Sequence, residues 1–82
     1  MGKIDVTIIE AFAKGDGSSH TVASDTGLSV SWFKFDVEMA CGFRMRKKVF
    51  VYNGVALDKK KNLRDYGIDD GSVIEVHDKP SS

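Results

Sequence analysis

The sequence from residue 50 to residue 57 reads Phe50-Val51-Tyr52-Asn53-Gly54-Val55-Ala56-Leu57. Its first part is β-branched and aromatic, and its last part is a short apolar run. Asn-Gly between two apolar runs is a strong signal for a two-residue hairpin turn, because both turn positions need a positive φ. The stretch therefore predicts a strand, a tight turn at Asn53-Gly54 and a short return strand.

The residues after this hairpin predict a polar loop, a short helix and a last strand. Leu63 to Ile68 has the length of one or two helical turns, and Gly67 suits the left-handed conformation that ends a helix. Between Ser72 and His77, the apolar residues Ile74 and Val76 alternate with polar ones. This is the period of a strand with one buried face.

The residues before the hairpin predict the main helix, over residues 29–41. Ser29 can accept a hydrogen bond from a free amide of the first turn, and Gly42 can end the helix. One side of the helix carries the residues expected in the core, which are Val30, Phe33, Val37, Ala40 and Cys41.

The N-terminal third predicts a second hairpin. Ile4, Val6 and Ile8 alternate with polar residues over 3–9, and residues 14–19 are rich in Gly, Asp and Ser, which favours a turn. A second strand is expected near residues 20–24, although Val22 is its one large apolar residue. The order of elements predicts a two-layer α+β domain with one helix packed on one sheet.

From about residue 29 to residue 77, the sequence resembles the ubiquitin-like family. The motif is a strand followed by Gly54 and Leu57, then Leu-x-Asp-Tyr-x-Ile over 63–68, then Ser-Val-Ile-Glu-Val over 72–76. The resemblance implies a β-grasp fold, in which one main helix packs across a mixed sheet of four to five strands and a short helix precedes the last strand. We expect one ubiquitin-like domain over residues 1–79 and a flexible C-terminal tail over 80–82.

The resemblance also implies a protein-binding surface on the sheet. Ubiquitin's main partner surface is an apolar patch, and its positions correspond here to Val51, Glu75 and His77, with Val49 beside them. The valines keep apolar contact, but charged and polar groups surround them. We expect this face to bind proteins, with ubiquitin receptors and proteasome subunits as candidates, or a partner more polar or basic than ubiquitin's own.

The C-terminal sequence bears on how the domain would act. Ubiquitin-like modifiers are activated through a Gly-Gly carboxylate, whereas this chain ends Asp78-Lys79-Pro80-Ser81-Ser82. We expect a non-conjugated docking module taken from a longer protein. Two alternatives stay open: a modifier whose processed form is not represented here, and a β-grasp module that binds a small GTPase or an anionic lipid.

A second apolar side of the helix does not fit the usual pattern. Trp32, Phe35 and Met39 lie nearly opposite the core-facing residues, although a helix on a single sheet normally has one polar side. One interpretation is that residues 9–28, or the loop with Phe43 and Met45, cover this side. The other is that it is exposed as a protein-binding patch or a homodimer contact.

Charge and cysteine content limit the partners and the compartment. Lys plus Arg and Asp plus Glu both number 12, so the net charge is zero and the total charge does not indicate nucleic acid. The basic runs at 44–48 and 59–61 are interpreted as solvated loop charges, with an anionic partner as the alternative; we do not expect a membrane lipid. A single cysteine favours a reducing compartment, so we expect an intracellular protein, cytoplasmic or nuclear.

The sequence offers no constellation for chemistry. Cys41 falls on the predicted buried side of the helix, where free cysteine behaves as a small core residue. Cys41, His20 and His77 do not have the spacing of metal ligands, and Asp69-Asp70 is interpreted as turn chemistry. We therefore predict no catalytic residue, no metal site and no cofactor, and a protein that is not an enzyme.

Overall fold

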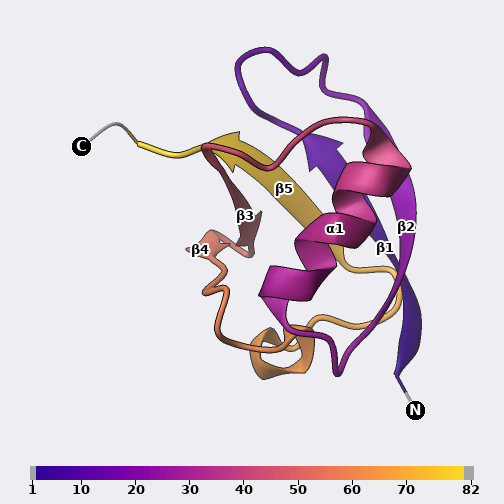
Figure 1. The fold of residues 1–82 in the computed structure, drawn as a ribbon. Helices are drawn as coiled ribbons and strands as arrows, with labels where there is room; N and C mark the ends of the chain where they lie inside the picture. Colours follow the sequence, from indigo (N-terminus) through magenta and orange to yellow (C-terminus); the bar gives the residue numbers. More distant parts are fainter. Residues whose placement is uncertain (1, 81–82) are drawn as a thin grey trace.

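The computed structural model describes residues 2–80, which form a five-stranded mixed sheet with one helix across it (Figure 1). The strands are β1 (Lys3–Glu10), β2 (Ser19–Asp25), β3 (Lys48–Tyr52), β4 (Val55–Ala56) and β5 (Val73–Asp78), in the spatial order β2-β1-β5-β3-β4. The main helix is α1 (Val30–Cys41), and a 3-10 helix, η1 (Leu63–Tyr66), precedes β5. This is the predicted β-grasp architecture, with all five strands present.

The two strands at the centre of the sheet are β1 and β5, which run parallel. Thr7 pairs with Val73 and Ile9 with Glu75. Antiparallel β2 and β3 flank this central pair, and Val6 pairs with Val22 across the first hairpin. The second strand, for which the sequence signal was weakest, is therefore confirmed.

Local signals at both ends of α1 act as predicted. The Ser29 hydroxyl accepts a hydrogen bond from the Trp32 backbone N–H at 3.3 Å. Gly42 takes φ 80°, a left-handed conformation that only glycine adopts without strain, and its N–H donates to the Glu38 carbonyl. The helix therefore begins and ends where its flanking residues can satisfy free backbone groups.

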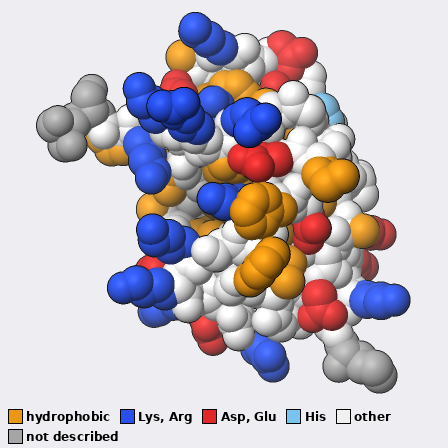
Figure 2. Space-filling model, in the orientation of Figure 1, with side chains coloured by type: hydrophobic (Ala, Val, Ile, Leu, Met, Phe, Trp, Pro, Cys, Tyr) orange, Lys and Arg blue, Asp and Glu red, His pale blue; other side chains and the backbone are white. Residues whose placement is uncertain are grey.

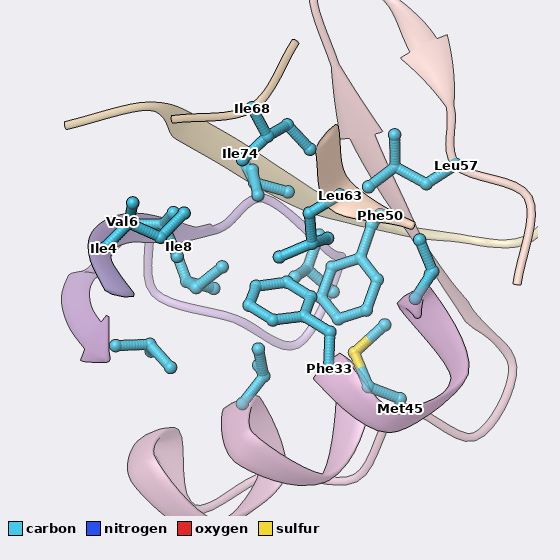
Figure 3. Packing of buried hydrophobic residues seen from close by; sticks show 14 of the residues in the cluster. Ile4, Val6, Ile8, Phe33, Met45, Phe50, Leu57, Leu63, Ile68 and Ile74 are labelled. Carbon is cyan, nitrogen blue, oxygen red and sulfur yellow. The ribbon is translucent and has the colours of Figure 1, made fainter. Parts of the chain in front are cut away.

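The core lies between α1 and one face of the sheet. Phe33 of α1 points toward Phe50 of β3, with ring centroids 5.1 Å apart, and Leu63 of η1 packs between them and the isoleucines (Figure 3). Val30 and Val37 are buried on the same side of the helix. The alternating residues Ile4, Val6, Ile8, Ile74 and Val76 supply the sheet side of the core.

One expected core position is wrong, because Ala40 is exposed. Cys41 is only partly buried and packs against the edge of the core. Phe12 and Met45, which come from the segments on either side of the helix, are buried instead. Phe12 packs edge-on against Phe43 with centroids 5.0 Å apart, so these loop residues close the end of the core.

The hairpin and the short helix that indicated the fold also form. Asn53 and Gly54 both have positive φ, and Tyr52 pairs with Val55 across the two-residue turn. The Tyr66 hydroxyl accepts a hydrogen bond from the Asp58 backbone N–H at 2.6 Å. Because Tyr66 closes η1, this bond ties the short helix to the loop that leads into it. Of the predicted tail, Ser81 and Ser82 lie outside the described residues.

Candidate functional site

The open face of the sheet, opposite α1, brings the four predicted sheet residues together. In the antiparallel register of β3 and β5, Val49 lies directly beside His77 and Val51 beside Glu75. Their neighbours along each strand, such as Phe50 and Val76, point into the core. Strand alternation therefore places all four side chains on one surface, which we call the sheet patch.

Two further apolar residues adjoin the sheet patch. Ile9 lies beside Glu75 in the parallel register of β1 and β5, and Val73 points outward with half of its surface exposed. Neither residue was among the predicted sheet residues. The alternation of side chains along a strand could have identified them. Residues 4, 6 and 8 of β1 face the core, so Ile9 faces the opposite side, and Val73 lies on the same side of β5 as Glu75 and His77.

Polar groups divide this apolar surface. The Nε2 atom of His77 lies 2.7 Å from the Oε1 atom of Glu75, and both side chains are about half exposed. A polar contact between two side chains with this exposure contributes little to stability. It does place one carboxylate and one imidazole between the valines and Ile9, so the sheet patch offers both apolar contact and hydrogen-bonding groups.

The second apolar side of α1 is exposed. Relative exposure is 65% for Trp32, 48% for Phe35 and 88% for Met39, and the space-filling view shows apolar side chains on the outer surface of the helix (Figure 2). We call these three residues the helix stripe. The interpretation that the neighbouring segments cover it is wrong, because the large apolar residues of those segments, Phe12 and Met45, are buried in the core.

The helix stripe has internal order. The rings of Trp32 and Phe35 lie 5.7 Å apart in a tilted arrangement. The Lys34 ammonium group lies 5.1 Å from the centre of the Phe35 ring, within cation–π distance. The two aromatic rings thus form an apolar surface of the kind that serves as a binding anchor, and the exposed Met39 side chain follows four residues after Phe35 on the same helix.

The one cysteine is not arranged as a nucleophile. Burial and the nearby Glu10 carboxylate, in that order, raise the pKa of the Cys41 thiol. Glu10 is itself paired with His20. A raised pKa keeps the thiol protonated and therefore weakly nucleophilic.

Within residues 2–80, His, Cys, Asp and Glu side chains do not gather in a group of three that could hold a metal ion. The helices of the same residues are too short and too polar to cross a membrane.

Comparison with known proteins gives matches of two kinds. The ubiquitin family model matches residues 12–81. Among solved structures, a ubiquitin-like domain of an Arabidopsis thaliana protein has 29% sequence identity and a TM-score of 0.79, with 99% of this chain and 82% of that chain covered. No curated protein matches the chain.

Two more distant structures share the fold. Ubiquitin of Caldiarchaeum subterraneum has 20% identity and a TM-score of 0.75, with 99% of each chain covered. The UBL domain of Plasmodium falciparum Dsk2 has 21% identity and a TM-score of 0.78, with 94% of this chain and 99% of that chain covered.

Proposed function

The chain belongs to the ubiquitin family, and from that premise we propose that it is a non-conjugated protein-interaction module. Its partners would be components of the ubiquitin pathway, proteasome subunits or a partner private to this protein. The single cysteine, half-buried and without a disulfide, supports action inside the cell, in the cytoplasm or nucleus. We propose a docking role and not a catalytic one, since the Cys41 pKa is raised away from the range of a reactive thiol.

The observation that carries this proposal is the exposure of the helix stripe. Small domains in water rarely leave Trp, Phe and Met side by side on a surface, because each keeps a large apolar area in water. Trp32 and Met39 are both more than half exposed. Trp is the residue most enriched at interface hot spots, and Met adapts its shape to different partners. Protein binding is the role that this arrangement supports best.

The sheet patch supports a second contact on the opposite side of the molecule. By the family resemblance, Val51 corresponds to a position of ubiquitin's partner surface. Val49 lies on the same strand two residues before it, and Ile9 and Val73 are further apolar residues on this face of the sheet. Conjugation to other proteins is the alternative function, and a separate experiment tests it. Incubation with activating enzymes and ATP is expected to yield no thioester; a thioester would favour the modifier.

Binding to defined partners tests the proposal. The immobilised domain is exposed to purified proteasomes and to ubiquitin receptors, and capture is compared for the wild type, Val51→Arg and Phe35→Arg. Matched controls add the same charge on the same elements away from both surfaces: Thr21→Arg on the open face of β2, and Ala40→Arg, which lies round the helix from the stripe.

Capture that Val51→Arg abolishes and Thr21→Arg preserves would assign the sheet patch to the ubiquitin system. Capture that Phe35→Arg alone abolishes would assign the binding to the helix stripe. If neither variant differs from its control, or the wild type captures none of these proteins, docking onto the ubiquitin system is wrong.

A further inference from the structure

A groove with basic walls lies beside α1, on the side toward β3. It has a volume of about 770 Å³ and is formed by α1, the segment 44–50, and Leu57, Lys59 and Lys79. Met45, Phe50 and Leu57 are among its lining residues, and each is at most 9% exposed, so they form a closed apolar floor. We call this feature the basic groove.

The walls of the basic groove concentrate the positive charge of the molecule. Seven of the chain's 12 Lys and Arg residues line it, drawn from four separate parts of the sequence. Figure 2 shows Lys and Arg side chains crowded on the side of the molecule that carries β3 and the end of β5. In the sequence, the two basic runs at 44–48 and 59–61 were expected to be solvated loop charges. The fold brings the first run together with Lys34, Lys59 and Lys79, and leaves Lys60 and Lys61 outside.

Within residues 2–80, these cations have no carboxylate partner at salt-bridge distance. The close contacts between basic and acidic side chains in that range are His20–Glu10 and His77–Glu75, and neither contains Lys or Arg. Glu38 is the one acidic residue among those lining the groove. Its carboxylate accepts a hydrogen bond from the Met45 backbone N–H at 2.8 Å, so it holds the wall in place.

Uncompensated cations around an apolar hollow create a local positive potential even though the net charge of the chain is zero. Low-dielectric walls focus the field into the hollow and raise the local concentration of anions. An anionic ligand would also relieve the mutual repulsion of the cations. The chemistry of the groove therefore suits a ligand that combines negative charge with an apolar part.

We propose that the basic groove binds a short acidic segment of a partner protein in an extended conformation, with one apolar side chain directed at the floor formed by Met45, Phe50 and Leu57. Carboxylates would pair with the cations of the two walls. This surface meets the sheet patch at Val49, but Val51 and Phe35 are not among its lining residues. It therefore adds a further mode of recognition to the module.

An acidic peptide fits better than the other large anions. A membrane presents a plane of headgroups, which suits cations on a protruding surface, whereas these cations surround a hollow of about 770 Å³. Single-stranded nucleic acid needs exposed aromatic rings on which bases stack. The one aromatic ring in the groove, that of Phe50, is 3% exposed.

The test uses the full chain and a fluorescein-labelled peptide, acetyl-Asp-Glu-Asp-Leu-Asp-Leu-Glu-Asp-amide, with binding measured by fluorescence anisotropy. Arg46→Glu combined with Lys59→Glu, both on the groove walls, is expected to weaken binding by about tenfold or more. The matched control, Lys14→Glu with Lys60→Glu, makes the same change in net charge at exposed positions outside the groove and should weaken binding by about twofold at most. Replacing both Leu of the peptide with Ser should also weaken binding several-fold.

An amide chemical-shift titration locates the site independently. Shifts are expected in residues 31–38 and 44–48, while Val73 and Glu75 of the sheet face stay unchanged. Circular dichroism and thermal midpoints establish that each variant is folded; if the doubly reversed variant is not, Arg46→Gln and Lys59→Gln replace it, with Lys14→Gln and Lys60→Gln as controls.

Equal weakening by groove and control variants, or no binding of the peptide, would overturn the proposal. So would binding to phosphatidylserine vesicles or oligo-dT that depends on Arg46 and Lys59 when peptide binding does not. These outcomes are independent of Val51 and Phe35, so the groove can fail while the docking function stands, and the reverse.

Discussion

The two sides of α1 both carry large apolar residues, but one side is buried and the other is exposed. Val30, Phe33 and Val37 are at most 5% exposed, whereas Trp32, Phe35 and Met39 are 48% exposed or more. One sheet supplies one surface for burial, so a helix with two apolar sides must leave one in water. An apolar side chain is therefore suited to burial, but it is buried only where another layer of the fold packs against it. In this two-layer fold, the sheet covers one side of the helix.

The largest expected effect is at the centre of the buried side. Phe33→Ala would remove a ring that is 0% exposed and packs on Phe50, leaving a cavity between helix and sheet. We expect a loss of about 3–5 kcal/mol in the free energy of unfolding. Urea denaturation measures it, with Phe35→Ala as the matched control, since it makes the same change two residues away on the exposed side. Similar losses for the two variants would remove the distinction between the sides.

A smaller effect is expected at the start of the helix, which both sides share. Ser29→Ala would remove the hydroxyl that accepts from the Trp32 N–H. Loss of such a cap costs about 1 kcal/mol in the free energy of unfolding. Ser29→Asp should restore the acceptor and most of the stability. No loss in thermal or urea denaturation for Ser29→Ala would mean that packing, and not the cap, sets where α1 begins.

Features written in adjacent residues were predictable from the sequence. Ser29 and Gly42 mark the ends of α1, and Asn53-Gly54 marks the hairpin, because each acts on backbone groups within a few residues. The four sheet-patch positions were also found, since strand alternation and the family resemblance together specify which side chains share a face. Their role in binding stays a prediction.

Features assembled from distant segments were not predictable in the same way. The basic groove needs Lys34, Arg46, Lys59 and Lys79 to converge, and no local pattern encodes that. Similarly, Cys41 has the helical spacing of a core residue but lies in the last turn, where Phe12 and Phe43 close the core from other segments. The sequence shows which side of a helix is apolar. It does not show how far along the helix other segments pack against that side.

Cys41 lies in the last turn of the buried side of α1, where the side chain is only partly covered, and its reactivity tests that partial burial. Because burial and the Glu10 carboxylate raise its pKa, the thiolate fraction at a given pH is smaller in the folded chain than in the unfolded one. The rate of alkylation by iodoacetamide should therefore rise at higher pH than for free cysteine, and should increase in denaturant. Glu10→Gln should lower the pKa of Cys41 while leaving it above the ordinary value, since burial is the larger cause. A folded-state profile that matches free cysteine would contradict the half-buried position.

The smallest effect on stability is expected at the centre of the helix stripe. Phe35→Glu places a carboxylate where 48% of the side chain already faces water, and beside the ammonium group of Lys34, so no charge is buried. We expect the free energy of unfolding to stay within about 0.5 kcal/mol of the wild-type value, as for other surface substitutions. A loss of several kcal/mol would show that the stripe is covered. Near-wild-type stability combined with lost partner binding would separate the two sides of the helix by role, because the residues that hold the fold together would then be different from those that recognise another protein.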